Sequence, residues 1–196
     1  MVKKITKTQI IASYLNDYSR SYYLRELASL LKKSHQTIKP YVELLVKEKI
    51  LIKTERKNII EFKLNFKNKR LYDYLVIAEK EKLIARLEND TLLRVLYDKI
   101  NGLFNDNTFI IFGSSVNQIE KAADIDLLVI GRKDIKKEIE DFEEVYNKKI
   151  HKVQTNDFKK LGLTLIKEIY AKHLIFNNTE KVIRSFGELY EKNKLV

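Results

Sequence analysis

The chain has 196 residues, of which 44% are hydrophobic and 33% are charged, a balance typical of a folded globular protein rather than a disordered one. It contains no cysteine, which excludes disulfides, thiolate nucleophiles and cysteine-bound zinc. No stretch reaches the roughly 18 apolar residues of a membrane helix, and the N-terminus lacks the apolar region of a signal peptide. We therefore expect a cytoplasmic protein with no membrane partner.

The excess positive charge is concentrated at the N-terminal end of the chain. Residues 1–70 hold 17 lysines and arginines and 6 acidic residues, a net charge of +11, whereas residues 71–196 hold 21 of each kind. A basic module joined to a neutral one indicates a polyanionic partner for the basic module alone. Nucleic acid is therefore the expected partner of the first third of the chain.

Three short helices are predicted before residue 50. Apolar residues recur at helical spacing in segments 7–15 and 23–31, and the lysine pair at 32–33 forms a short turn. Ser34 is a suitable cap for a third helix, whose buried stripe is Ile38, Val42 and Leu45. Two helices joined by a turn of this length make a helix-turn-helix.

From residue 50 the apolar period changes to two, which predicts strands over 50–56 and 58–65 with a basic turn between them. The order of elements is three helices and then a basic hairpin. The segment LRELASLLKKSHQTIKPYVELLVKEKILI resembles the winged helix-turn-helix of prokaryotic transcriptional regulators. This resemblance implies a domain over residues 1–66 that binds duplex DNA and takes part in transcription regulation.

The same resemblance implies which side chains contact DNA. Ser34 would be one of the DNA-binding residues, and the helix that it caps would present Gln36, Thr37, Lys39 and Tyr41 to the major groove. The hairpin would bring Arg56 and Lys57 to the backbone or the minor groove. Pro40 departs from the pattern, because a proline past the first turn removes a helical hydrogen bond and is expected to kink the helix or delay its start. The alternative is that the lysines are a solvated surface and the module mediates dimerisation or other protein contacts.

A helical connector is predicted over residues 67–104. Segment 71–87 has helical spacing of its leucines, Asn89 and Asp90 interrupt it, and segment 91–104 forms a second amphipathic helix. After this connector, strand 108–112 runs directly into Gly113 and Ser114.

A second strand begins at Asp124 and continues to Gly131. Because side chains alternate along a strand, Asp124 and Asp126 are expected on one face. Two neighbouring carboxylates repel each other unless a cation lies between them, and Mg²⁺ prefers oxygen ligands of this kind. The Gly-Ser turn can present backbone amides to a phosphate, since glycine allows a close approach.

The stretch FGSSVNQIEKAADIDLLVIG resembles the signature of the polymerase-β-like nucleotidyltransferase superfamily, in particular the minimal nucleotidyltransferases of prokaryotes. In that signature a Gly-Ser turn is followed, after a short spacer, by Asp-x-Asp. Here nine residues separate Ser114 from Asp124. The resemblance runs from residue 108 to about residue 160 and implies an α/β (α+β) domain with a small mixed sheet over residues 105–196.

This resemblance assigns roles to five residues. Gly113, Ser114 and Ser115 would hold a nucleoside triphosphate, and Asp124 and Asp126 would be catalytic ligands of Mg²⁺, with two ions in an active enzyme. The implied reaction moves a nucleoside monophosphate to a hydroxyl group by in-line transfer. The acceptor would be a nucleic acid or a protein, and a partner toxin is one conceivable acceptor.

One family feature is missing. A third carboxylate usually follows on a later strand, but the corresponding segment here, 148–155, contains no acid and has Lys149 and His151 instead. The nearest acids lie outside that strand: Asp141, Glu143, Glu144 and Asp157. Three readings remain open: an active nucleotidyltransferase, a transcriptional regulator whose degenerate nucleotidyltransferase domain binds nucleotide or a partner, and an accidental match.

The rest of the chain predicts a helix over 134–146, a helix over 163–171, a strand over 173–176 and a helix over 179–191 with Thr179 as a cap. His151 and His173 are expected to be structural. No histidine lies at a spacing that would support Ser115 as a nucleophile. A homodimer is an open alternative, since winged-helix regulators commonly read two half-sites.

Overall fold

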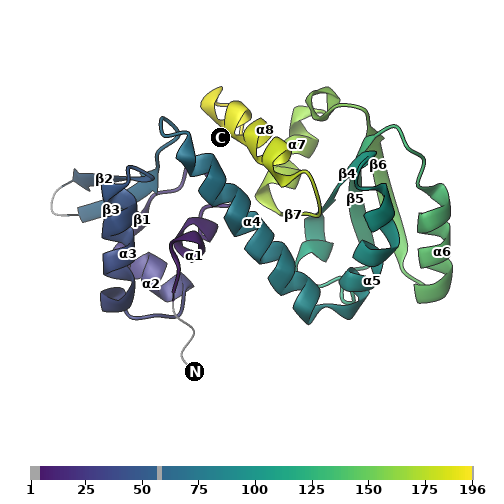
Figure 1. The fold of residues 1–196 in the computed structure, drawn as a ribbon, viewed down its shortest axis with the longest axis horizontal. Coiled ribbons are helices and arrows are strands. Elements are labelled where there is room, and N and C mark those ends of the chain that lie inside the picture. Colours follow the sequence, from purple (N-terminus) through teal and green to yellow (C-terminus); the bar gives the residue numbers. More distant parts are fainter. Residues whose placement is uncertain (1–4, 57–58, 196) are drawn as a thin grey trace. The chain divides into compact units, whose positions relative to one another are not determined.

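The computed structural model describes residues 5–56 and 59–195 and shows a mixed α/β protein (Figure 1). Its internal contacts divide the chain into two compact units. The first unit comprises Met1–Glu79 and Phe186–Val196, and the second comprises Lys80–Ser185. This division splits the connector expected at 67–104 between both units and assigns the last residues of the chain to the first unit. Within the described ranges, none of the helices combines the length and apolar composition needed to cross a bilayer.

The first unit contains all helices and strands from α1 to β3 and the first half of α4. In chain order these are α1 (Lys7–Ala12), β1 (Tyr22–Tyr23), α2 (Leu24–Leu30), α3 (His35–Lys47), β2 (Leu51–Arg56), β3 (Ile59–Leu64) and the first half of α4 (Arg70–Asn89). The three strands form one antiparallel sheet in the order β1-β3-β2. The predicted order of three helices and a hairpin is confirmed, whereas the short strand β1 was not predicted.

Helix α3 begins where the sequence predicts. The Ser34 side chain accepts a hydrogen bond from the Thr37 amide at 3.2 Å, so Ser34 is the N-terminal cap. The apolar stripe of this helix is fully buried, as expected: Ile38, Val42 and Leu45. Pro40 lies inside the helix, which starts at His35. The expectation of a delayed start is therefore wrong, since Pro40 is the sixth residue of a helix that begins directly after Ser34.

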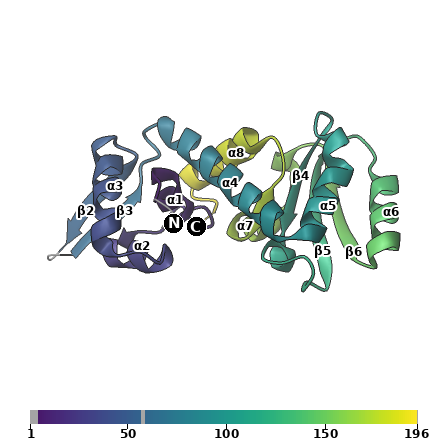
Figure 2. The same cartoon turned by 60° about the horizontal axis from the view of Figure 1, so that its bottom comes forward.

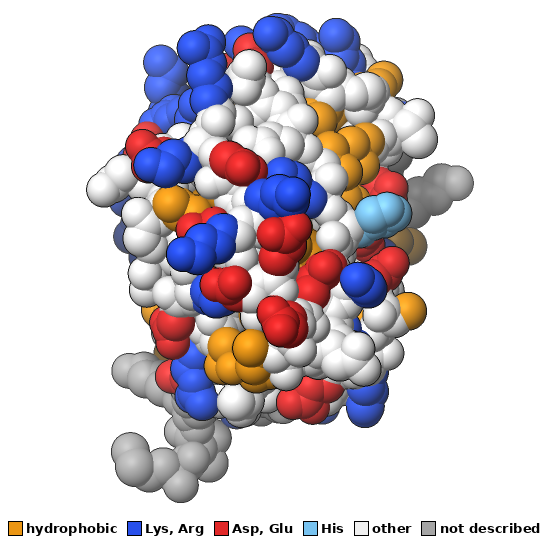
Figure 3. All heavy atoms as spheres, turned by 90° about the vertical axis from the view of Figure 1, so that its right-hand side faces the viewer, with side chains coloured by type: hydrophobic (Ala, Val, Ile, Leu, Met, Phe, Trp, Pro, Cys, Tyr) orange, Lys and Arg blue, Asp and Glu red, His pale blue; other side chains and the backbone are white. Residues whose placement is uncertain are grey.

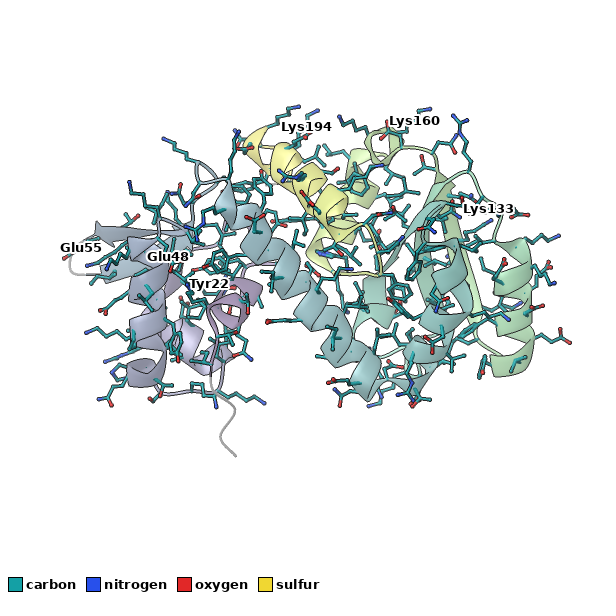
Figure 4. All side chains as sticks on the ribbon, in the orientation of Figure 1. Tyr22, Glu48, Glu55, Lys133, Lys160 and Lys194 are labelled. Atoms are coloured by element: carbon teal, nitrogen blue, oxygen red, sulfur yellow. The ribbon has the colours of Figure 1, made fainter. Side chains whose placement is uncertain are left out.

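Side-chain hydrogen bonds connect the helices of the first unit. The Glu48 carboxylate, at the end of α3, accepts hydrogen bonds from Lys7 Nζ at 2.7 Å and from the Tyr74 hydroxyl at 2.8 Å. The Tyr22 hydroxyl donates to the Ser13 carbonyl at 2.8 Å. Figure 4 labels both Tyr22 and Glu48 (Figure 4). These contacts join α1, α3 and α4 into one body.

The second unit is built on a four-stranded sheet. Its elements are the second half of α4, α5 (Thr91–Ile100), η1 (Asn101–Leu103), β4 (Asn107–Phe112), η2 (Gly113–Val116), β5 (Asp124–Gly131), α6 (Lys136–Tyr146), β6 (Lys149–Thr155), η3 (Phe158–Lys160), α7 (Leu163–Ala171), β7 (His173–Ile175) and most of α8 (Thr179–Glu191). The strand order is β6-β5-β4-β7, with β5 and β6 parallel and the other pairs antiparallel. The small mixed sheet predicted from the sequence is thus confirmed.

The alternation of side chains along β5 decides where the core of this unit lies. Ile125, Leu127 and Val129 share one face and belong to a buried cluster with residues of α5 and α6. Both helices lie next to the sheet in the two views of Figure 1 and Figure 2. The opposite face of β5 begins with Asp124 and Asp126 and continues with buried apolar residues. The half-buried Asp124 and Asp126 are therefore the part of that face that a ligand could reach.

Gly187, in α8, shows how closely the end of this helix packs within the first unit. A Cβ atom at residue 187 would overlap the ring of Tyr72. The neighbouring Tyr190 ring lies 4.7 Å from Phe66 and 6.0 Å from Tyr18. An added methyl group would therefore have to displace an aromatic cluster that has little space to yield.

We predict that Gly187→Ala destabilises the protein by about 1–3 kcal/mol through overpacking, although alanine is the better helix former. Denaturant unfolding measures the effect. Gly162→Ala is the matched control, because a Cβ at residue 162 meets nothing within 4 Å. Equal stability of the two variants would contradict the packing described for α8.

Candidate functional site

The exposed side of α3 carries the residues that the sequence assigns to DNA contact. Gln36, Thr37 and Lys39 are exposed, whereas Tyr41 is half-buried. The Ser34 and Thr37 hydroxyl oxygens lie 2.8 Å apart and engage each other at the helix start. Lys39 Nζ lies 3.8 Å from Glu43, and both side chains are more than half exposed, so this pair leaves Lys39 available to a stronger anion.

The hairpin β2–β3 contributes further positive charge. Arg56 is the last residue of β2, and its backbone is in register with Ile59, while Lys57 lies outside the described residues. Lys53, which sequence reasoning did not select, is exposed and lines a cavity of about 320 Å³ together with Lys39. The other lining residues come from α2, α3 and β3 and are apolar except for Glu43: Leu24, Val42, Glu43, Val46, Ile60 and Phe62. Lys39 of α3 and Lys53 of β2 therefore border the same cavity.

The predicted pair of carboxylates is confirmed on β5. Asp124 and Asp126 are half-buried and alternate with the fully buried Ile125, so they share the face that lacks the α5 and α6 contacts. In the parallel pairing with β6, Asp124 is in register with Lys149 and Asp126 with His151. Register partners share a face of the sheet, and His151 Nδ1 lies 3.8 Å from Asp126 Oδ1, so Asp124, Asp126 and His151 form one cluster.

Gly113 lies directly against this cluster. Its φ of 71° is in the left-handed region, and a Cβ on it would be 2.6 Å from Asp126 Oδ2. Only glycine fits there, because any side chain would collide with the carboxylate. Its amide donates to the Lys172 carbonyl at 3.2 Å, so that amide is already used in the fold.

The two serines after Gly113 differ in what they offer. Ser114 is exposed, whereas Ser115 is 1% exposed and its hydroxyl donates to the Phe112 carbonyl at 3.1 Å. Ser115 therefore stabilises the turn from inside. Of the serine hydroxyls predicted to hold a nucleotide, that of Ser114 remains open to a ligand.

Strand β6 presents His151 and Lys149, not a carboxylate, beside the aspartates. His151 Nδ1 lies 3.8 Å from Asp126 Oδ1, and the His151 side chain is 81% exposed, so this histidine is not packed in the core. Lys149 Nζ is 3.5 Å from Glu143, which offsets its charge. His173, in contrast, is fully buried with Nδ1 3.0 Å from two carbonyls of α7, as expected for a structural histidine.

Three of the four acids that were considered as substitutes for the missing carboxylate have structural contacts. Asp141 pairs with Lys99 at 3.2 Å. Glu143 accepts the Ile150 amide at 2.6 Å, and Asp157 caps the short helix η3. The fourth, Glu144, is exposed on α6.

The pKa of the Asp126 carboxyl departs from its ordinary value. Burial raises its pKa above the ordinary value, and the nearby charge of Asp124 raises it further, while His151 lowers it and Glu168 adds a smaller increase. Glu168 on α7 was not selected from the sequence, because its approach to Asp126 depends on α7 folding back toward β4. Burial and, to a smaller extent, the charge of Asp124 both disfavour the ionised Asp126 carboxylate, and a cation beside it would favour the ionised form.

The donor set fits Mg²⁺ brought in with a phosphate ligand better than a metal held by protein alone. Within the described ranges, no three His, Cys, Asp or Glu side chains are grouped closely enough to hold a metal ion. Mg²⁺ is commonly bound by one or two carboxylates, with water and substrate phosphates completing its shell. Asp124 and Asp126 meet that requirement.

One face of the molecule mixes acidic and basic side chains. Figure 3 views the molecule from the side on which α6 lies in Figure 1; acidic and basic side chains are interspersed over the centre of this face, and basic ones gather along its upper edge (Figure 3). This agrees with the equal numbers of acidic and basic residues in segment 71–196.

Comparison of the chain with protein-family models, with curated proteins and with solved structures found no match, so the candidate sites stand on their own geometry.

Proposed function

We propose that the chain is a DNA-binding nucleotidyltransferase: a winged helix-turn-helix joined to a polymerase-β-like domain that moves a nucleoside monophosphate from a nucleoside triphosphate to a hydroxyl. The observation that carries the proposal is the contact between the Gly113 turn and the Asp126 carboxylate, with Asp124 on the same face. In this proposal the turn would bring a phosphate held by the exposed Ser114 hydroxyl next to the Mg²⁺ ligands Asp124 and Asp126.

In this proposal Asp124 and Asp126 would hold Mg²⁺, which would supply positive charge to the triphosphate. Ser114 would donate its exposed hydroxyl to a phosphate oxygen, and Gly113 allows the turn to approach the Asp126 carboxylate. The acceptor oxygen attacks the α-phosphorus, and pyrophosphate leaves with the electron pair of the broken P–O bond. His151 is the exposed basic group beside Asp126, and its imidazole nitrogen accepts the proton of the attacking hydroxyl.

For the first unit, the proposal is supported by the basic charge of residues 1–70 and by the exposed residues along α3. Lys39 and Lys53 would contact phosphates, which provides affinity without sequence information. Gln36 is the exposed polar side chain at the start of α3 that suits contacts to base edges.

A second candidate function is a transcriptional regulator whose nucleotidyltransferase-like domain binds nucleotide or a partner without transfer. One observation favours it: β6 places Lys149 and His151 beside the aspartates, where the family resemblance implies a third carboxylate. A cationic residue there weakens the attraction for a second metal ion.

The proposed site in the second unit predicts nucleotide binding. Calorimetry should detect binding of a nucleoside triphosphate to the wild type in the presence of Mg²⁺, and Asp126→Asn should weaken it at least tenfold. The same variant should raise the melting temperature near neutral pH, because the ionised Asp126 is buried and repelled. Since the folded-state pKa is raised, this gain should shrink as the pH falls and Asp126 becomes protonated.

Glu144→Gln is the control, since this exposed α6 carboxylate lies outside the cluster. Loss of nucleotide binding together with increased stability separates a ligand role from misfolding. Unaltered binding by Asp126→Asn would refute the site.

The proposed DNA contacts of the first unit predict a salt-dependent affinity for duplex DNA. Lys39→Ala and Lys53→Ala should each weaken binding to duplex DNA and reduce the slope of log K against log salt by about 1, as expected for loss of one phosphate contact. Fluorescence anisotropy at several salt concentrations measures the slope. Lys160→Ala, an exposed lysine of the second unit, should leave it unchanged. Equal slopes of log K against log salt in all variants would contradict the assignment of the DNA contacts to α3 and the hairpin.

A further inference from the structure

The segment between the Gly113 turn and Asp124 is held at four backbone groups by three side chains from elsewhere in the second unit. Arg86 Nε donates to the Val116 carbonyl at 3.0 Å. The Ile119 amide donates to Asp90 Oδ2 at 3.1 Å. Lys148 Nζ donates to the carbonyls of residues 120 and 122. Apart from η2, no helix or strand is present between residues 113 and 124, so these contacts define the path of the segment.

Asp90 is the centre of this arrangement. Its side chain is 1% exposed, and both carboxylate oxygens are used. Oδ1 accepts the Leu93 amide at 3.0 Å and caps α5, while Oδ2 accepts the Ile119 amide and lies 2.9 Å from Arg86 Nη2. A buried carboxylate is stable only when it is paired and hydrogen-bonded, and these three donors meet that need.

Arg86 connects the buried charge to the site segment. Its Nε and Nη2 are directed to two different acceptors, the Val116 carbonyl and Asp90. The planar guanidinium holds two such donors at fixed angles, which the single ammonium of a lysine does not. Val116 is the last residue of η2, which begins at Gly113, so this contact is three residues from the glycine that lies against Asp126.

We infer that Arg86 and Asp90 are positioning residues, which hold the Gly113 turn at the distance from Asp126 that ligand binding requires. The inference rests on the proposed function for the identity of the ligand, but not for the order of the segment. Residues that orient a binding group typically change affinity by about 10–100-fold when they are removed.

The test compares Arg86→Met with Arg86→Lys and with Lys99→Met. Lys99 forms an ion pair with Asp141 between α5 and α6 at 3.2 Å and contacts nothing in segment 113–124 among the described interactions. Hydrogen exchange of the full chain without ligand reports the order of residues 116–122. Calorimetry with a nucleoside triphosphate and Mg²⁺ reports the affinity.

Arg86→Met should accelerate exchange of the 116–122 amides at least tenfold and weaken nucleotide affinity about tenfold. Arg86→Lys should recover part of both effects, and Lys99→Met should change neither. Unchanged exchange in Arg86→Met would overturn the inference, as would an acceleration spread evenly over the whole second unit. Faster local exchange in a protein whose wild type binds no nucleotide would uphold the positioning role and refute the proposed function instead.

Discussion

The contact between Gly113 and Asp126 is the constraint on which the candidate site depends. A Cβ at residue 113 would be 2.6 Å from the carboxylate, so the turn and the acid can coexist only because residue 113 is glycine. The turn is fixed by the Lys172 carbonyl on one side and by the Arg86–Asp90 pair on the other. The Gly113 turn, which follows β4, is thereby in contact with residues of β5 and α4 and with the residue that ends α7.

This arrangement has a cost in stability. Asp126 is held charged in a half-buried position near Asp124, and its pKa is raised as a result. An uncharged residue at this position would avoid both effects that oppose folding here, the burial of a charge and the repulsion from Asp124. The usual reason for such a cost is a bound cation or a reacting group, and perturbed acids of this kind gather at functional sites.

Much of this structure could be predicted from particular residues. Ser34 and the stripe of Ile38, Val42 and Leu45 predict α3, and the alternation about Ile125 predicts that the two aspartates share a face. The contacts of His151 and Glu168 with Asp126 could not be predicted, because they depend on the register of β6 and on the packing of α7. The contact of Arg86 could not be predicted either, because it joins α4 to the Val116 carbonyl, which is 30 residues away in the sequence. Local pattern determines elements, whereas these contacts arise between elements.

The most direct test of the central claim is a transfer assay on the purified chain. Each nucleoside triphosphate, labelled at the α-phosphate, would be supplied with Mg²⁺, duplex DNA and RNA, with Asp124→Asn as the inactive control. The account predicts that label moves to a hydroxyl of nucleic acid or protein with the wild type alone, with release of pyrophosphate. Tight Mg²⁺-dependent nucleotide binding without transfer to any acceptor would contradict the enzymatic claim and support a regulator with a binding site in its place.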